Sequence, residues 1–115
     1  GDALARGTVT FSCIPTIAAT VFPRIIREFR RRHPGVKIEM TDDATVSMER
    51  KIIDGEVEFG IGGVPKRSDE LDFAPIVEDP FVLVCRTDHP LARHRRVPID
   101  EILRFPIVML AKDSN

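Results

Sequence analysis

Residues 8–29 read TVTFSCIPTIAATVFPRIIREF, and this stretch decides how the rest of the chain is organised. Residues 8–13 are rich in β-branched and apolar side chains, which predicts a half-buried strand. From residue 17 onward apolar side chains recur at helical spacing and predict an amphipathic helix with one broad apolar stripe. The stripe consists of Ile17, Val21, Ile25 and Phe29, with Phe22 and Ile26 beside them.

A strand that leads straight into a helix leaves backbone N–H groups free at the turn between them. Together with the positive end of the helix dipole, these donors form a site suited to an anion. Pro15 and Thr16 occupy this turn. Two interpretations of Thr16 stay open: its hydroxyl caps the helix, or it meets the carboxylate of a ligand. Pro23 removes one helical hydrogen bond, so either the helix is kinked near Thr20 or it begins at Thr20. The apolar stripe already begins at Ile17, which favours the kink.

The alternation of strand and helix continues along the chain. Residues 36–40 alternate apolar and polar side chains, as a half-exposed strand does. Residues 45–53 predict a second helix, with Thr45 as its cap. Residues 57–63 predict a third strand, which ends in glycines. This order predicts a parallel sheet with right-handed crossovers, in which ligands bind at the carboxyl ends of the strands. The three ends are residues 15–16, 43–45 and 62–65.

The glycines at residues 60, 62 and 63 have two possible explanations. A nucleotide-binding turn would need a helix directly after the strand, and no helical pattern follows here. We therefore expect the glycines to allow close packing of the backbone at the end of this strand.

The second half of the chain predicts further strands at residues 71–77 and 81–85. A short helix at residues 98–103 has a proline in its first turn, and residues 105–110 form a final strand. Residues 78–80, Glu-Asp-Pro, lie between the first two of these strands and are expected to form a crossing point between lobes.

Composition limits the classes of protein that the chain can represent. Its 115 residues suit one domain or a piece of a larger one. A net charge of −1 argues against a dedicated nucleic-acid surface, and no apolar run approaches the roughly 20 residues of a membrane span. The first residues do not resemble a secretory signal. Cys13 and Cys85 lie in apolar, strand-like runs, which predicts buried free thiols in a reducing cytosol. We therefore expect a cytoplasmic protein with no membrane partner.

A run of arginines closes the first predicted helix. Arg27, Arg30, Arg31 and Arg32 precede His-Pro-Gly at residues 33–35. Basic side chains suit the negative end of the helix dipole, and Pro-Gly stops a helix. This explanation requires no DNA; a phosphate-binding patch is the alternative.

Catalysis by histidine would require a carboxylate or nucleophile arranged around the ring. His33 and His89 each precede a proline, and His94 lies in a basic run, so we expect all three to face solvent. The sequence has no paired-carboxylate motif, no metal-ligand spacing and no nucleophile elbow. It therefore predicts that the chain is not an enzyme and holds no metal or cofactor.

A series of short motifs runs through the chain between Gly7 and Ser114. They are Gly7-Thr8-Val9, Phe22-Pro23, Phe29 through His33-Pro34-Gly35-Val36, Asp54-Gly55 before Phe59-Gly60-Ile61, Asp88-His89-Pro90-Leu91-Ala92, residues 98–103 and Phe105-Pro106-Ile107. In this order they resemble the N-terminal portion of the effector-binding domain of the LysR-type transcriptional regulators. The resemblance implies an α/β domain with two lobes, similar to periplasmic binding proteins, and a small effector in the cleft between them.

The resemblance also implies how the chain divides. Residues 1–6 are the end of a linker, residues 7–79 the incomplete first lobe, and residues 80–115 the truncated start of the second. The resemblance maps effector contacts onto Pro15, Thr16, Thr45 and Ser114. The implied effector is a small polar or anionic molecule that modulates transcription.

The implied partners follow from the same family. Its members pair as homodimers or tetramers through the first helix, which lies against the second lobe of a partner subunit. They bind DNA through an N-terminal helix-turn-helix that is absent from this chain. A solute-binding protein of a transport system, with the same fold, is the alternative function.

Overall fold

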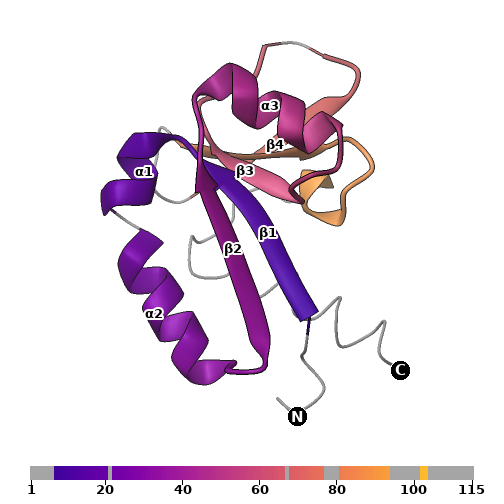
Figure 1. The fold of residues 1–115 in the computed structure, drawn as a ribbon. Helices are drawn as coiled ribbons and strands as arrows, with labels where there is room; N and C mark the ends of the chain where they lie inside the picture. The colour runs from indigo at the N-terminus through magenta and orange to yellow at the C-terminus, as the bar shows by residue number, and fades with distance from the viewer. Residues whose placement is uncertain (1–6, 21, 67, 77–80, 94–101, 104–115) are drawn as a thin grey trace.

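The computed structural model describes residues 7–20, 22–66, 68–76, 81–93 and 102–103, and within them five strands form one sheet (Figure 1). Their order across the sheet is β2-β1-β3-β5-β4. In chain order they are β1 (Gly7–Cys13), β2 (Val36–Asp42), β3 (Phe59–Gly62), β4 (Leu71–Pro75) and β5 (Val82–Arg86). β1 pairs in parallel with both β2 and β3, which confirms the predicted parallel arrangement. The carboxyl ends of these three strands therefore lie at one edge of the sheet.

The helices connect the parallel strands. α1 (Pro15–Thr20) and α2 (Phe22–Arg32) follow β1, and α3 (Thr45–Ile53) follows β2. α1 ends at Thr20 and α2 begins at Phe22, so Pro23 lies in the first turn of a helix, where a proline is tolerated. The kink expected near Thr20 falls at Val21, which lies outside the described residues. A short 3-10 helix, η2 (Pro90–Arg93), follows β5.

Apolar side chains pack on both faces of the sheet. On one face, the Phe11 ring of β1 lies 5.0 Å from the ring of Phe22 and stacks on that of Phe59 at 5.2 Å between centroids. This core also takes Ile17, Ile25 and Phe29 from the two helices after β1. On the other face, α3 contributes Met48 and Ile52, which pack with Val57, Leu71, Val82 and Val84. Burial of both faces is what an α/β layer arrangement requires.

The third strand is shorter than the sequence predicted. It begins at Phe59 and not at residue 57. The N–H groups of Glu56 and Val57 both donate to the carbonyl of Lys51, so these residues belong to the turn that ends α3. That turn passes through Gly55, whose φ of 78° favours glycine.

The later strands join the same sheet with the opposite direction. β5 pairs antiparallel with β3, and β4 pairs antiparallel with β5. The lobe boundary that we expected between residues 79 and 80 therefore falls between two strands of one sheet. The predicted strand at residues 105–110, most of the helix at 98–103, and Ser114 lie outside the described residues.

Both cysteines are buried and free, as predicted. Burial raises the pKa of each thiol to about 12, so neither is a thiolate at neutral pH. Within the described ranges, no helix combines the length and apolar character that crossing a membrane demands.

Candidate functional site

Backbone hydrogen bonds tie together the segments that follow the three parallel strands. The N–H of Ile14, after β1, donates to the carbonyl of Ile61 in β3 at 3.1 Å. The N–H of Asp43, after β2, donates to the carbonyl of Cys13 in β1 at 2.9 Å. Both bonds continue the sheet by one residue beyond the strands. The starts of α1 and α3 are therefore held at the same edge, where the sequence predicted a ligand.

Pro15 and Thr16 lie exposed in the first turn of α1. The carbonyl of Ile14 accepts hydrogen bonds from the N–H groups of Ile17 and Ala18, both at 3.1 Å, so Ile14 is the residue that caps the helix. The interpretation of Thr16 as the cap is wrong. Its carbonyl accepts a 2.6 Å hydrogen bond from the Thr20 hydroxyl, while its own hydroxyl has no hydrogen-bond partner in the described part of the chain.

Thr45 is likewise not the cap of its helix. The N-cap of α3 is Ala44, with φ −62° and ψ 155°, and no side chain donates or accepts a capping hydrogen bond there. Thr45 is the first helical residue and is exposed. The structure thus brings Pro15, Thr16 and Thr45 to one edge as exposed groups in the first turns of two helices, whereas Ser114 lies outside the described residues.

Sequence reasoning missed the group that dominates this edge, the Asp43 carboxylate. Its Oδ2 accepts hydrogen bonds of 2.7 Å from the hydroxyls of Ser12 and Thr41. The Lys51 ammonium donates to both of its oxygens, at 2.9 and 3.1 Å. We call these four residues the Asp43 cluster. Ser12, on β1, is fully buried, and a hydroxyl between the apolar residues Phe11 and Cys13 is the signal that could have indicated a polar partner.

These contacts control the charge of Asp43. The hydrogen bonds from Ser12 and Thr41 have the largest effect, and the hydrogen bonds and positive charge of Lys51 add to it. Together they lower the pKa of Asp43 from 3.8 to about 2, against the opposing effect of burial. The Asp43 side chain is 13% exposed and that of Lys51 26%. The Asp43 carboxylate is therefore shielded from bulk water, and it stays ionised at any physiological pH.

Gly60 and Gly62 of β3 allow close packing against the backbone, as the sequence predicted. A Cβ at Gly60 would lie 2.7 Å from Sδ of Met48, and one at Gly62 would lie 3.1 Å from its terminal methyl group. Gly60 and Gly62 therefore let α3 approach the sheet closely, beside the start of α1. A Cβ at Gly63 would meet nothing within 4 Å.

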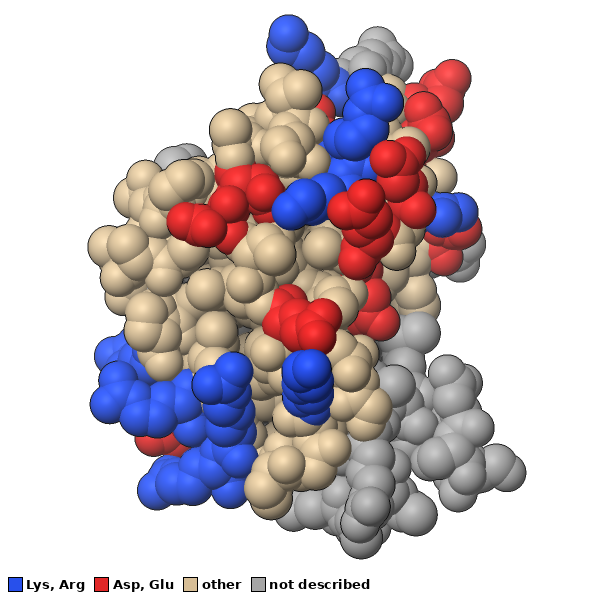
Figure 2. Space-filling model, viewed as in Figure 1, with Lys and Arg blue, Asp and Glu red and all other residues tan. Residues whose placement is uncertain are grey.

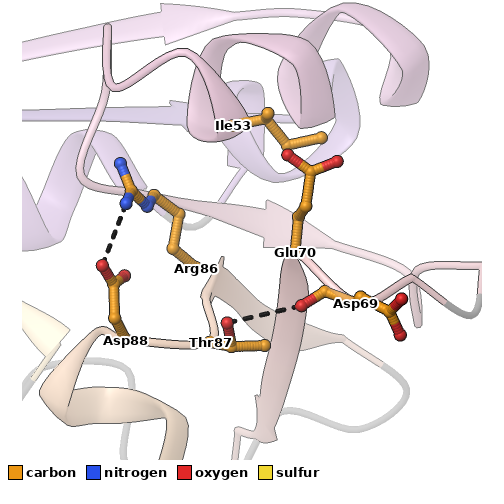
Figure 3. A pocket seen from close by; sticks show the side chains of 6 residues that line it. All are labelled: Ile53, Asp69, Glu70, Arg86, Thr87 and Asp88. Carbon is orange, nitrogen blue, oxygen red and sulfur yellow. Dashed lines mark hydrogen bonds and ion pairs between the residues drawn. The ribbon is translucent and has the colours of Figure 1, made fainter.

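A separate pocket of about 250 Å³ lies elsewhere in the fold (Figure 3). Its lining residues are Ile53, Asp69, Glu70, Arg86, Thr87 and Asp88. Because Cys85 pairs with Phe59, the end of β5 lies beside the start of β3, at the edge opposite the Asp43 cluster. Arg86 is paired with Asp88 at 2.9 Å. None of the candidate ligand residues named from the sequence lines this pocket.

Two of the three histidines, His33 and His89, lie in the described part of the chain. His33 and His89 are partly buried, which corrects the expectation that they face solvent. The ring of His33 packs against that of Phe29 at 4.9 Å, and burial lowers the pKa of His89. His94 lies outside the described residues. Among the residues that the structure covers, no three His, Cys, Asp or Glu side chains gather as a metal site would require.

The fold defines a class of protein, an α/β domain with polar groups at the carboxyl ends of its parallel strands, which is where sheets of this kind bind ligands. The chain belongs to the LysR substrate binding domain family, whose model matches residues 2–115. This is a family of transcriptional regulators and not of enzymes, as the sequence predicted.

Relatives and solved structures agree with this assignment. The chain is 33% identical over 114 residues to the uncharacterised regulator YbhD of Escherichia coli. This alignment covers 99% of the chain and 36% of YbhD. The structure of HinK, a LysR family regulator from Pseudomonas aeruginosa, matches with a TM-score of 0.59 at 20% identity. The match covers 63% of this chain and 25% of the HinK chain. The BenM effector-binding domain, solved with its effector benzoate, matches with a TM-score of 0.52 at 21% identity. The match covers 57% of this chain and 30% of the BenM chain. The chain thus spans about a third of the length of these proteins.

Proposed function

We propose that the chain is the N-terminal part of the effector-sensing domain of a LysR-type regulator in the cytoplasm, which binds a small polar or anionic molecule to modulate transcription. The observation that carries the proposal is the edge where β1, β2 and β3 end. There the exposed hydroxyls of Thr16 and Thr45, in the first turns of α1 and α3, lie beside backbone N–H groups that the helices leave free. The benzoate bound by BenM is a carboxylate, which supports an effector of this class.

Membership of a family of transcriptional regulators favours this function over a solute-binding protein of similar fold. The chain spans only about a third of its relatives' length. DNA binding through a helix-turn-helix is therefore proposed for the whole protein and not for this chain.

The test is a thermal-shift screen of small carboxylates and their uncharged analogues on the full-length protein, followed by titration of the best compound. We expect Thr16→Val and Thr45→Val each to weaken binding about tenfold, the cost of one lost hydrogen bond that leaves a polar group of the ligand unpaired. Thr8→Val is the matched control, because Thr8 is exposed at the other end of β1. If both variants bind as tightly as the parent, the effector is recognised elsewhere.

We also propose that the protein self-associates through the first helical segment, now resolved as α1 and α2. Ile25, part of the apolar stripe predicted for this helix, is only 8% exposed and belongs to the core, so it is not available for such a contact. Pro23, Ile26 and Arg30 of α2 instead line a hollow of about 520 Å³ with Ile38, Glu39 and Met40 of β2. β2 is an outer strand of the sheet, and the unpaired groups of such a strand favour coverage by another chain.

A further inference from the structure

The Asp43 cluster has the composition of an anion-binding site, but its anion belongs to the chain. Two hydroxyls and one ammonium converge on a single carboxylate at distances of 2.7 to 3.1 Å. Proteins recognise a ligand carboxylate with the same kinds of donor. The cluster lies where β1 and β2 end, at the edge that the proposed function assigns to the effector.

The donors of this cluster are already used. The single hydroxyl hydrogens of Ser12 and Thr41 both point to Oδ2 of Asp43, and the Lys51 ammonium reaches both carboxylate oxygens. The charges of Asp43 and Lys51 cancel. A second anion arriving here would find no free hydroxyl hydrogen, and would lie against the Asp43 charge with its neighbour Asp42 exposed beside it.

We propose that Asp43 is a selectivity residue that keeps ligand anions away from the donors of Ser12, Thr41 and Lys51. It neutralises the Lys51 charge at the β2 end of the site, so that an uncharged polar part of the ligand lies there. Any charged part lies toward the ends of β1 and β3. The ligand side of this inference rests on the proposed function, whereas the state of the three donors can be measured by itself.

The decisive experiment is chemical rescue of the full-length protein with formate, the smallest carboxylate. Asp43→Ala removes the carboxylate and leaves Ser12, Thr41 and Lys51 in place. Thermal unfolding is followed by circular dichroism in sodium formate and in sodium chloride of equal ionic strength. We expect Asp43→Ala to lower the unfolding midpoint in chloride, and formate to restore at least half of the loss in a saturable manner. The parent should have the same midpoint in both salts.

Three further variants make the result specific. Asp43→Ala combined with Lys51→Gln should lose the rescue, because the ammonium that attracts the anion is gone. Asp42→Ala, which removes a neighbouring exposed carboxylate outside the cluster, should respond to formate no more than the parent does. Asp43→Asn keeps the side chain's shape and an oxygen for the two hydroxyls, so it tests the proposal even where Asp43→Ala does not fold. In this variant the Lys51 ammonium has lost the charge that it pairs with, so formate should shift the amide NMR signals around residue 51.

Two outcomes would overturn the inference. One is a formate-dependent midpoint in the parent equal to that of Asp43→Ala, which would mean that Asp43 excludes nothing. The other is the absence of any formate effect in both Asp43→Ala and Asp43→Asn, which would mean that the donors do not form an anion site. Neither outcome depends on the effector, so a failure of the proposed function and a failure of this inference are distinguishable.

Discussion

The Asp43 carboxyl links the stability of the fold to pH. Its pKa is about 2 in the folded chain against an ordinary 3.8, because Ser12, Thr41 and Lys51 favour the charged form. The folded-state pKa is the lower one, so the unfolded chain takes up a proton first as the pH falls. The stabilisation by Asp43, about 2 kcal/mol for a shift of this size in a mostly buried group, is complete above the ordinary pKa. It is lost as the pH falls from about 4 to about 2.

Urea unfolding of the parent and of Asp43→Asn at a series of pH values measures this contribution. We expect the difference in unfolding free energy between the two proteins to be largest near neutral pH and to shrink over that acidic window. Asp42→Asn is the control. It also removes one carboxylate, but one that makes no side-chain hydrogen bond in the described part of the chain. The comparison therefore distinguishes the loss of the cluster's hydrogen bonds from the loss of one negative charge. A difference that stays constant down to pH 2 would mean that the Asp43 carboxyl is not stabilised in its charged form.

At the scale of elements, the alternation of strands and helices could be read from the sequence, but the residues that cap the helices could not. Ser, Thr, Asp and Asn are the usual caps, and both Thr16 and Thr45 matched that preference. In the structure the sheet bonds run one residue past β1 and β2, through the N–H groups of Ile14 and Asp43. The helices then begin at once, so Ile14 and Ala44 become the caps and the two threonines fall inside the first turns.

The pairing of the later strands also could not be predicted from the sequence. The apolar run of β5 predicts a strand buried on both faces, and it is one. An apolar run does not specify its partners: β4 comes directly before β5 in the chain, but the other neighbour, β3, is distant in sequence. The sequence could not show that β5 continues the first sheet beside β3. We propose on this ground that the first lobe extends through β5 and does not end at residue 79.

The close approach of α3 to β3 makes a prediction at this scale. A Cβ at Gly60 would lie 2.7 Å from Sδ of Met48 and 3.0 Å from Cδ1 of Ile52, both fully buried. We expect Gly60→Ala to destabilise the chain by about 1–3 kcal/mol, the usual cost of overpacking a core. Gly63→Ala is the matched control, since a Cβ there meets nothing within 4 Å. Equilibrium unfolding in urea compares the two variants with the parent.

Combining Gly60→Ala with Met48→Ala would identify the cause of any loss. The smaller side chain relieves the clash, so the double variant should lose less stability than the sum of the two single changes. Equal stability of Gly60→Ala and Gly63→Ala would show that α3 moves away from the sheet at little cost, and that the glycines do not set its distance.

Over the whole molecule, charge is distributed unevenly. Figure 2 shows Lys and Arg side chains gathered over α2, whereas acidic side chains lie mainly over the half of the molecule that carries α3. α2 contains five arginines and one glutamate, a net charge of +4. Of these arginines, Arg31 pairs with Glu28 at 3.0 Å. Two α2 helices placed against each other would repel, so this helix is suited to meet a different and less basic surface of a second copy.

That restriction shapes the prediction for self-association. In a two-fold dimer, α2 of each subunit would lie against another region of its partner, so the contact occurs twice. Ile26 is the partly buried apolar residue of α2 that lines the hollow beside β2, and a charge there should weaken both copies of the contact. We expect Ile26→Glu to shift the full-length protein toward a smaller assembly in sedimentation velocity, by at least tenfold in the dissociation constant. Val46→Glu is the control, because Val46 is 79% exposed on α3, away from the hollow. A dimer that persists unchanged in Ile26→Glu, or one that Val46→Glu disrupts equally, would place the interface elsewhere.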